Sequence, residues 1–516
     1  MQKEFRNCEF IDFSNEESRK KMELALAKAK LEFGKEYPII IGGKRIRKGK
    51  GIISYNPSHK HEIIGVARRG TPDLAEKALD AAWKAFDSWK RVPLEKRIDV
   101  MLKAKDLMLE RREEFNAWVV HEAGKSWAEA DGEVAETIDF LDFYSRQAMQ
   151  WCANQELTPC KGERNYMKYI PLGVGAMIPP WNYPCAILAG ITIASVVAGN
   201  TVVVKPASDT PVTGAKFVEL LEEAGLPEGV VNFVPGSGPE VGNFLVSNPR
   251  TRFIAFTGSR DVGLQIFEKA GISQPGQIWM KRVIAEMGGK DATIIDSEAD
   301  LESAALGTMQ AAYGYQGQKC SACSRAIVVE DVYEEFIGRL ADYTRTLKIG
   351  PAEDFSSDIG PVINRRAFDK VMGYIRLGME EGSLVLGGIA DSSSGHFIEP
   401  TIIRDVAWDA RTAQEEMFGP VLPVIKARDF EDAMRIANST EYGLTGALYT
   451  RNLEKLRKAE EDFHVGNLYL NRKCTGAFVG AHPFGGFNMS GTDSKTGGKE
   501  YLLLFLQAKT IAEKKA

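Results

Sequence analysis

Two cysteines stand three residues apart in the string GQKCSACSR, which covers residues 317 to 325. Three kinds of chemistry use cysteines at such a spacing: a redox dithiol, half of a metal site, or one nucleophilic thiol beside an unrelated neighbour. A structural zinc needs four ligands, and none of the six histidines lies beside a second cysteine pair. A thioredoxin-like pair opens the helix after the first strand of a small domain, whereas Cys320 and Cys323 lie mid-chain.

The remaining interpretation makes Cys320 a nucleophile and Cys323 a small buried residue. Lys319 places a cation next to Cys320 in the sequence, and the surrounding small residues leave room for a substrate, which favours a reactive thiolate. The string by itself leaves the question open, so other strings have to be weighed with it.

Two further strings place polar side chains where a ligand could reach them. EMGGK (286–290) puts Glu286 at the end of a predicted strand, before two glycines that let a ligand approach the backbone; the alternative is a surface glutamate before a turn. PPWNYP (179–184) surrounds Trp181 and Asn182 with three prolines. An amide held that rigidly can donate to a developing oxyanion, and the alternative is an ordinary proline-rich turn.

FTGSRDVG (256–263) follows a predicted strand and opens a predicted helix, whose N-terminus can receive a pyrophosphate. Gly258 and Gly263 are spaced as G-x4-G, which matches neither the G-x-G-x-x-G fingerprint nor a Walker loop, so the string is a weak signal. PLGVG (171–175) contains a G-x-G, but a strand follows it, and we assign no site to it.

The elements that must position these residues follow from hydrophobic periodicity. Apolar residues recur at helical spacing over 74–89, after Thr71 at the cap and Pro72 in the first turn, and a second helical block covers 133–151. We interpret both as packing against the core. Between 168 and 300, short apolar runs alternate with helical segments, which is typical of βαβ units on a parallel sheet. Ligands bind beyond the carboxyl ends of such strands.

A second series of strands and helices begins after Cys320, in the strings SRAIVVED, FIEPTII, PVLPVIKA, TGALYT and GNLYLN, and predicts another α/β domain. Two leftover segments, 156–171 and 501–514, are too short to fold alone. We expect them to form one outlying sheet whose apolar edge meets a second subunit. A chain of 516 residues exceeds one ordinary core, so two or three domains are expected.

Composition excludes several classes of function. Apolar residues make up 44% and charged residues 26% of the chain, as in packed globular proteins. The formal net charge of −5 gives no reason to expect nucleic acid or a membrane surface as a partner. We expect no secretory signal and no membrane span, because CAILAGITIASVVAG (185–199) is too short and predicts a buried helix. Scattered cysteines indicate reduced thiols and a cytoplasmic location.

Taken in order, the strings PWNYP, KPA, FTGS, EMGGK, GQKC, EEMFGPV and PFGG resemble the aldehyde dehydrogenase superfamily, from about residue 38 to about residue 510. The resemblance implies an α/β fold and a homodimer or higher homo-oligomer, with no metal. The implied parts are a Rossmann-type NAD(P)-binding domain (38–155 and 172–285), a catalytic domain (286–473), a small oligomerisation or bridging sheet (156–171 and 486–516) and an N-terminal helical extension (1–37).

The resemblance also implies roles for the residues picked out above. Cys320 would attack the aldehyde, Asn182 and the Cys320 backbone N–H would bind the oxyanion, and Glu286 would act as general base toward water. The resemblance therefore implies an oxidoreductase that passes through a cysteine thiohemiacetal and a thioester.

The implied cofactor is NAD, with NADP possible. Lys205 and Ser208 would contact the adenosine ribose. The other implied contacts are Gly258 and Ser259 with the pyrophosphate, Glu416 and Phe418 with the nicotinamide ribose, and Ile178, Pro179, Pro180, Trp181 and Gly288 elsewhere on the dinucleotide. NAD-preferring members often carry glutamate where this chain has Ser208, and the neutral serine does not exclude a 2′-phosphate.

GQKCSACSR and CTGAFVGAHPFGGFNMSGTDSKTGG (474–498) closely resemble one branch of that superfamily, the 1-pyrroline-5-carboxylate dehydrogenases, which oxidise L-glutamate γ-semialdehyde to L-glutamate in proline degradation. By this resemblance Ser321, Gly476 and Ala477 hold the substrate α-carboxylate, and Phe484 packs on its aliphatic part. Small residues leave backbone N–H groups bare, so they can bind a carboxylate without an arginine; the alternative is a plain glycine-rich turn.

Three other functions remain to be weighed against this one. The chain could be a dehydrogenase for a different aldehyde, an acylating member that passes the thioester to coenzyme A, or a non-catalytic oligomeric protein on the same fold. Acylating members tend to lack the counterpart of Glu286, and a non-catalytic protein could lose Cys320, Glu286 or Asn182 without penalty, whereas this chain has all three.

Overall fold

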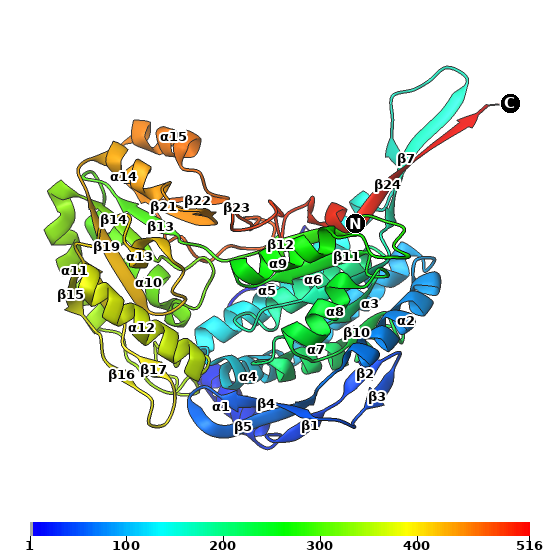
Figure 1. The fold of residues 1–516 in the computed structure, drawn as a ribbon, viewed down its shortest axis with the longest axis horizontal. Helices are drawn as coiled ribbons and strands as arrows, with labels where there is room; N and C mark the ends of the chain where they lie inside the picture. Colours follow the sequence, from blue (N-terminus) through cyan, green and yellow to red (C-terminus); the bar gives the residue numbers. More distant parts are fainter. Residues whose placement is uncertain (1–3, 516) are drawn as a thin grey trace.

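The computed structural model describes residues 4–515. Most of the chain forms two lobes, each built on a seven-stranded sheet, and a narrow three-stranded sheet projects from the first lobe (Figure 1). Residues 1–3 of the expected N-terminal extension and residue 516 of the expected outlying sheet lie outside the described residues.

The first lobe contains the strands expected between 168 and 300. Its sheet has the order β12-β11-β8-β9-β10-β2-β3, in which β8 to β12 are parallel and β2 and β3 form an antiparallel edge. The order reverses at β8, and a crevice for ligands opens at such a switch point. The strands are β2 (Ile39–Ile41), β3 (Lys44–Ile46), β8 (Val174–Ile178), β9 (Thr201–Val204), β10 (Val231–Phe233), β11 (Phe253–Thr257) and β12 (Arg282–Glu286).

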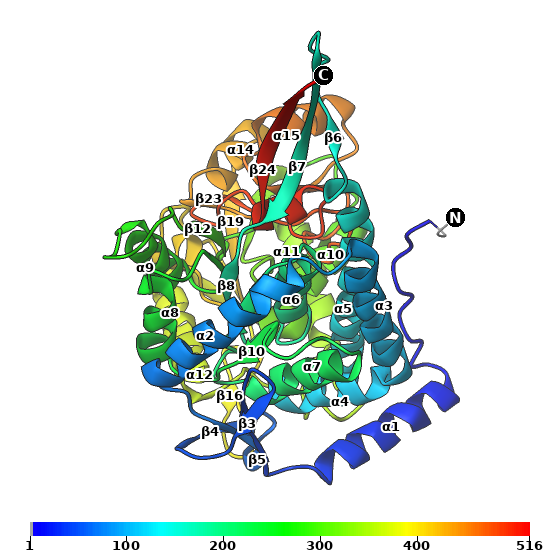
Figure 2. The ribbon, with the colours of Figure 1, turned by 90° about the vertical axis from the view of Figure 1, so that its right-hand side faces the viewer.

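Both faces of this sheet are covered by helices, because alternate strand residues are apolar on each side: Val202 and Val204 belong to one core and Val203 to another. One face is covered by α2 (Pro72–Trp89), α8 (Asn243–Ser247) and α9 (Arg260–Gly271). The other face carries α6 (Ala186–Val197) and α7 (Pro211–Glu223), with α3 (Leu94–Glu110), α4 (Arg112–Ala123), α5 (Trp127–Trp151) and α1 (Glu16–Lys30) outside them (Figure 2).

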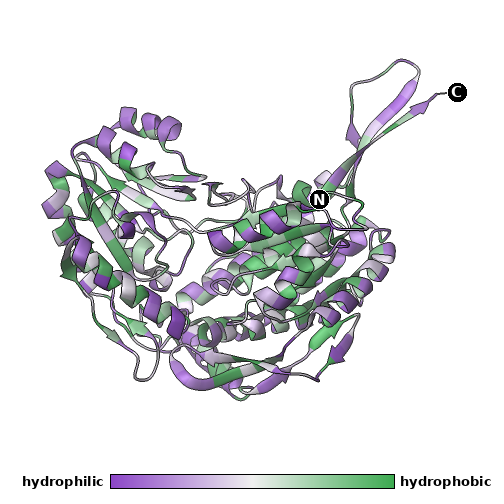
Figure 3. Ribbon diagram, in the orientation of Figure 1, coloured by the Kyte–Doolittle hydropathy of each residue, from purple (hydrophilic) through white to green (hydrophobic). Residues whose placement is uncertain are grey.

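Local sequence signals determine where these helices begin and which of them is buried, as expected. The Thr71 hydroxyl caps α2 by accepting from the Leu74 N–H, and Pro72 begins the helix. The apolar segment 185–199 forms the buried α6, and hydrophobic residues concentrate on the strands and on the helix faces turned toward them (Figure 3). In residues 4–515, no helix combines the length and the apolar character needed to cross a membrane.

The second lobe holds a sheet of order β15-β18-β19-β14-β13-β21-β22, parallel except for β15. These strands are β13 (Ala292–Ile295), β14 (Arg325–Val329), β15 (Ser383–Leu386), β18 (Thr401–Arg404), β19 (Val421–Ala427), β21 (Thr445–Tyr449) and β22 (Asn467–Leu470). One face carries α10 (Leu301–Tyr313) and α11 (Tyr333–Arg345), and the other α12 (Arg365–Glu381), α13 (Arg411–Gln414), α14 (Phe430–Ala437) and α15 (Leu453–Asp462).

One expected strand of this lobe is in fact two. The string FIEPTII is divided into β17 (Phe397–Ile398), which pairs with β16 (Ala390–Asp391), and β18, which joins the main sheet. Pro400 lies at the break, and its missing N–H prevents it from donating to either ladder. The remaining small pairings join β5 (His59–Arg68) to β1 (Lys35–Tyr37) and β4 (Gly51–Asn56), and β20 (Tyr442–Gly443) to β23 (Phe487–Asn488).

The two leftover segments pair with each other, as expected. β7 (Glu163–Pro171) lies antiparallel to β24 (Leu506–Lys514) over nine residues of each strand, and the short β6 (Gln155–Glu156) adds to the other side of β7. Most residues of β24 are exposed, so this sheet buries little surface within the chain.

The lobes meet through a short connection. β12 ends at Glu286 and β13 begins at Ala292, so the chain runs directly from the carboxyl edge of the first sheet to the amino edge of the second. The loops between these edges carry most of the residues implicated by the sequence. We propose the predicted domain boundaries on this basis, since the three larger units each contain one of the three main sheets and the N-terminal extension contains α1.

Candidate active site

The loop that carries Cys320 has a constrained backbone. After α10, Tyr315, Gln316 and Gly317 all adopt left-handed φ angles, of 50°, 55° and 65°. Such angles cost a non-glycine residue ~1–3 kcal/mol and persist only where the surroundings fix them. Here Tyr315 Oη donates to the Ala123 carbonyl at 3.0 Å, and a Cβ at Gly317 would lie 2.4 Å from the Gly419 carbonyl oxygen. The loop is therefore held firmly, and it presents Cys320 before β14.

Asn182 joins the first lobe to this loop. It follows β8 and is buried, and its Nδ2 donates to the Gln318 carbonyl at 2.9 Å, two residues before Cys320. Gln318 is itself fixed, because its Oε1 accepts from the Ile363 N–H at 2.9 Å. A side-chain amide has two N–H groups, so one remains for an oxyanion formed at Cys320.

Glu286 is the last residue of β12, and glycines surround its carboxyl group. The Ser494 hydroxyl and the Gly486 N–H donate to this carboxyl, whereas its Oε2 has no partner among the described residues. A Cβ at Gly485 or Gly491 would lie 3.0 or 3.2 Å from its oxygens. Burial raises the pKa of Glu286 to about 8, and the two hydrogen bonds oppose that rise. A carboxyl group with such a pKa can exchange protons near neutral pH.

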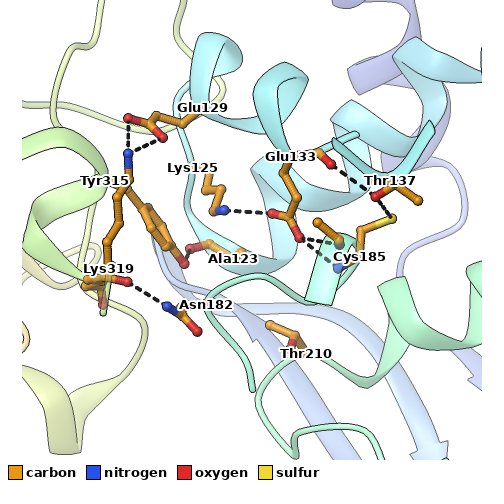
Figure 4. A network of polar contacts seen from close by, with 12 residues as sticks. Ala123, Lys125, Glu129, Glu133, Thr137, Asn182, Cys185, Thr210, Tyr315 and Lys319 are labelled. Carbon is orange, nitrogen blue, oxygen red and sulfur yellow. Dashed lines mark hydrogen bonds and ion pairs between the residues drawn. The ribbon is translucent and has the colours of Figure 1, made fainter. Parts of the chain in front are cut away.

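The surroundings of the resting Cys320 side chain favour the neutral thiol over the thiolate. Burial raises its pKa, and the negative charges of Asp291, Glu416 and Glu286 raise it further, while a hydrogen bond from the Ser321 N–H lowers it. The expectation that Lys319 favours a thiolate is wrong, because its ammonium pairs with Glu129 at 2.7 Å instead of facing the thiol (Figure 4). Adjacency in sequence does not place two side chains on the same side of an extended loop.

The Lys319–Glu129 pair belongs to a polar network along α5 (Figure 4). Lys125 and Glu133 form a second pair at 2.7 Å, with both side chains fully buried. The Glu133 carboxylate also accepts from the Cys185 N–H at 2.7 Å, just before α6, and the Lys125 ammonium lies 3.4 Å from the centre of the Tyr183 ring. These contacts fix the loop between Asn182 and α6 against α5.

Glu136 is a candidate that the sequence analysis missed. It lies on α5, burial raises its pKa to about 8, and among residues 4–515 it has no hydrogen bond or ion pair. Burial raises the pKa of the Tyr183 hydroxyl, and the nearby Glu129, Glu136, Glu133 and, when ionised, Cys320 raise it further. Glu136 and Cys320 therefore both lie near Tyr183. The sequence signal that could have identified Glu136 is the presence of acidic residues at helical spacing within the apolar block 133–151.

The predicted cofactor residues of the first lobe lie at the switch point of its sheet. Ile178 ends β8, and Pro179, Pro180 and Trp181 follow directly. The Trp181 ring meets the Phe418 ring of the second lobe edge to face, with centroids 5.5 Å apart. The Gly258 N–H donates to the Glu286 carbonyl at 3.1 Å, so the loop after β11 and the predicted base are directly joined.

The charge and donor pattern around these loops fits a dinucleotide. Ser259 precedes α9, and no side chain in the described part of the chain caps that helix, so its first N–H groups are available to a pyrophosphate. The buried Lys205 ammonium donates to the Pro206 and Gly236 carbonyls at 2.7 and 3.3 Å, and burial lowers its pKa to about 8. Among residues 4–515 no carboxylate forms an ion pair with it, and its third N–H is not used by these two carbonyls. Ser208 is exposed.

Glu416 approaches the connection between the lobes. Its Oε1 accepts from the Gly289 N–H at 3.2 Å, and burial raises its pKa. A Cβ at Gly288 would lie 2.3 Å from both carboxylate oxygens, so only glycine fits there with the carboxylate in this position. Phe418 adopts a φ of 60°, which turns the chain between Glu416 and β19.

The predicted substrate residues come from two loops in contact. Ser321 is buried, and its carbonyl accepts from the Cys474 thiol at 3.4 Å. Gly476 has a φ of 79° and is exposed, and its carbonyl accepts from Arg472 at 3.0 Å, with Ala477 next to it. Phe484 is half-buried and pairs through its backbone with Thr496. The structure thus brings the Cys320 loop and the 476–477 turn together through Cys474, whereas Ser208 lies on the exposed surface after β9.

Comparison with known proteins gives a consistent result. The model of the aldehyde dehydrogenase family matches residues 46–511. A protein of Geobacillus sp. (strain WCH70) named 1-pyrroline-5-carboxylate dehydrogenase is 55% identical over 97% of this chain and 98% of its own length. A protein of the same name from Geobacillus kaustophilus (strain HTA426) is 53% identical over 99% of each chain. The crystal structure of 1-pyrroline-5-carboxylate dehydrogenase from Thermus with bound NAD aligns with a TM-score of 0.98, at 49% identity and 99% coverage of both chains.

Proposed function

The chain belongs to the aldehyde dehydrogenase family, and from this premise we propose that it oxidises L-glutamate γ-semialdehyde, formed from 1-pyrroline-5-carboxylate, to L-glutamate in proline degradation, with NAD as hydride acceptor. One observation carries the proposal: Cys320 and Asn182 lie in loops between the two sheets and Glu286 ends β12 at the same place, in a chain that is 55% identical, over 97% of its length, to a 1-pyrroline-5-carboxylate dehydrogenase.

In the first step, the Cys320 thiol gives its proton to solvent water, and the sulfur then attacks the aldehyde carbon. The resulting thiohemiacetal oxyanion accepts hydrogen bonds from the free N–H of Asn182 and from the Cys320 N–H. NAD, when bound, supplies the acceptor for the hydride that leaves this carbon, so that a thioester to Cys320 remains.

In the second step, Glu286 takes a proton from a water molecule that attacks the thioester carbonyl, and glutamate leaves as the Cys320 sulfur is released. The raised pKa of Glu286, caused by its burial, suits this role because the group can both accept and return a proton near neutral pH. We assign the proton transfer to Oε2 of Glu286, because this oxygen has no hydrogen-bond partner among residues 4–515.

We assign the cofactor contacts to the crevice at the switch point of the first sheet. The uncapped N-terminus of α9 with Gly258 and Ser259 supports a pyrophosphate site, and Lys205 with Ser208 supports a ribose site. Glu416 and Phe418 support the nicotinamide ribose end, next to Gly288. The remaining contacts are assigned to Ile178, Pro179, Pro180 and Trp181.

The substrate differs from a simple aldehyde in its α-carboxylate and α-ammonium groups. Ser321 and the backbone of Gly476 and Ala477 are assigned to the carboxylate, and Phe484 to the aliphatic part. Glu136 is assigned to the ammonium group, since it is a buried acid near Tyr183 that has no hydrogen bond or ion pair among residues 4–515. A charge-assisted hydrogen bond of this kind contributes about 1.5–3 kcal/mol.

Steady-state kinetics with glutamate γ-semialdehyde and with propanal test the assignment, each with NAD and then NADP. We expect kcat/KM to be at least about 100-fold higher for glutamate γ-semialdehyde, because two charged anchors are lost with propanal. Equal values for the two aldehydes would show that the substrate is a different aldehyde.

We further propose that the chain forms a homodimer or a higher homo-oligomer. A sheet of three strands with exposed residues on β24 is marginal by itself, and a second copy would cover it. We also propose a cytoplasmic location, since the seven described cysteines are all free thiols.

A further inference from the structure

The N-terminal arm, defined as residues 5–11, and the anchor loop, defined as residues 474–482, lie against each other although they are far apart in sequence. The arm runs from α1 past α5 along the outside of the first lobe (Figure 2). The anchor loop contains Gly476 and Ala477, which we assigned to the substrate carboxylate. Contact between them ties a segment without any assigned chemistry to the substrate end of the site.

Asn7 makes the central contact. Its Nδ2 donates to Asp139 Oδ2 at 2.8 Å and to the Val479 carbonyl at 2.9 Å. Both partners can only accept, so the amide nitrogen, and not its oxygen, must face them. The two N–H groups of one amide are therefore divided between α5, which carries Asp139, and the anchor loop, which carries Val479.

The surrounding contacts hold the arm in register. The Cys8 N–H donates to Asp139 Oδ1 at 2.7 Å, so the Asp139 carboxylate accepts from two consecutive residues of the arm. Asp139 is buried, which raises its pKa to about 6, and these two hydrogen bonds favour its charged form. The Ile11 N–H donates to Asp131, also on α5, at 2.8 Å.

Aromatic contacts extend the same interface. The Phe10 and Phe478 rings stack with centroids 5.8 Å apart, and the Phe5 and Phe143 rings meet at 5.1 Å. Gly480 has a φ of 80°, and a Cβ there would lie 3.0 Å from Phe143 and 3.2 Å from Phe5. The anchor loop thus fits between the arm and α5 with no room for a larger residue at this point.

No hydrogen bond within residues 4–515 joins the anchor loop directly to α5, so the Asn7 amide provides the bridge between them. This matters because α5 also carries Glu136, one helical turn before Asp139. The groups assigned to the α-carboxylate and the α-ammonium of the substrate therefore belong to two separate elements, and the Asn7 amide sets their spacing.

We propose that Asn7 is a positioning residue that determines specificity: it fixes the anchor loop against α5 and so lets the site distinguish an α-amino acid aldehyde from an aldehyde without charged groups. The proposal rests on the proposed function, because it requires that the anchor loop binds the substrate carboxylate. It assigns the N-terminal arm to substrate selection and gives it no part in bond making or breaking.

The test compares Asn7→Ala with Glu9→Ala in the full chain. Glu9 is an exposed residue of the same arm whose side chain has no hydrogen bond or ion pair in the described structure. For Asn7→Ala we expect KM for glutamate γ-semialdehyde to rise about 5- to 50-fold, from the loss of two hydrogen bonds, with kcat within about threefold of the native value. We expect kcat/KM for propanal to stay within about twofold, and Glu9→Ala to match the native protein with both aldehydes.

Three results would overturn the inference: an unchanged KM, an equal loss with both aldehydes, or the same KM rise in Glu9→Ala. If native protein shows no preference for glutamate γ-semialdehyde over propanal, the proposed function fails instead, whatever the variants do. Should Asn7→Ala not fold, Phe10→Ala removes the stacking contact on Phe478 and is held to the same expectation. Amide hydrogen exchange provides a second readout, in which residues 474–482 exchange faster in Asn7→Ala while residues 315–323 do not.

Discussion

The Asn182 side-chain amide and the Gln318 carbonyl are joined by a hydrogen bond of 2.9 Å that links the two lobes beside the Cys320 sulfur. Because this bond uses one N–H and leaves the other for the oxyanion, we predict that Asn182→Ala lowers kcat by about 10²- to 10³-fold, with a smaller change in KM. Steady-state kinetics measure both constants. A kcat within about threefold of the native value, in a variant with native thermal stability, would exclude the oxyanion role.

The pH dependence of turnover should report Glu286. Burial raises its pKa to about 8, and the group must be ionised to take a proton from water, so kcat should rise with pH up to about 8 and then level off. In Glu286→Gln this acidic limb should disappear together with most of the turnover. A profile that is flat from pH 6 to 9 in the native protein would contradict the assignment, provided that hydrolysis limits the rate.

Ser494 should affect the pH at which kcat rises. Its hydroxyl donates to the Glu286 carboxylate and lowers the pKa of Glu286. In Ser494→Ala the charged form loses this donor, so the pKa of Glu286 should rise further and the acidic limb of kcat should move to higher pH. A shift toward lower pH, measured under the same conditions as the native protein, would show that Ser494 does not act through Glu286.

Ser208 should control the preference between the two dinucleotides. It is exposed and lies just after β9, where we place the adenosine ribose. A carboxylate in Ser208→Glu would repel a 2′-phosphate, so kcat/KM with NADP should fall at least tenfold relative to NAD. Ser208→Gln, which has the same length and no charge, is the matched control and should leave the ratio within about threefold of the native value.

Glu136 should affect the substrate and the stability in separate ways. In Glu136→Gln we expect KM for glutamate γ-semialdehyde to rise about 10- to 100-fold while kcat/KM for propanal stays unchanged, since propanal has no ammonium group. An equal effect on both aldehydes would exclude ammonium binding.

The stability effect follows from burial, which raises the pKa of Glu136 from 4.5 to about 8. The folded state binds the proton more tightly than the unfolded state, so the native protein loses stability as pH rises from about 4.5 to 8. Glu136→Gln has no such loss, and its melting temperature relative to the native protein should increase over that interval. Calorimetry at pH 5 and pH 8 measures the difference.

Much of the fold could be predicted because the signals are local. The alternation of apolar runs and helical segments indicated the parallel strands β8 to β11, and Thr71 with Pro72 indicated where α2 begins. The pairing of β7 with β24 also followed, since neither segment could bury its apolar residues alone. The break in FIEPTII was missed although Pro400 marked it, because the apolar pattern continues across the proline.

The site was only partly accessible from sequence. Glu286 and Asn182 follow strands of a parallel sheet, which is where ligands are expected, but Cys320 precedes its strand and faces the first sheet from the amino edge of the second. Lys319 was misjudged, since its partner Glu129 lies on a helix far away in the sequence. Asn7 acts through contacts with residues more than a hundred positions away, and Glu136 lies near Tyr183 of a different segment, so no local pattern records either role.

Residues 287–291, which connect β12 to β13, determine where chimaeras of such enzymes can be joined. Consider a chimaera in which the first lobe comes from a relative and the junction lies inside that segment. Its distance between the Glu286 carboxyl group and the Cys320 sulfur would change, even if each lobe folded well. A junction outside this segment takes Glu286, Gly288 and Gly289 from the same parent protein. It therefore keeps the contacts of Glu416 with Gly288 and with the Gly289 N–H. Chimaeras cut there are the ones to build first.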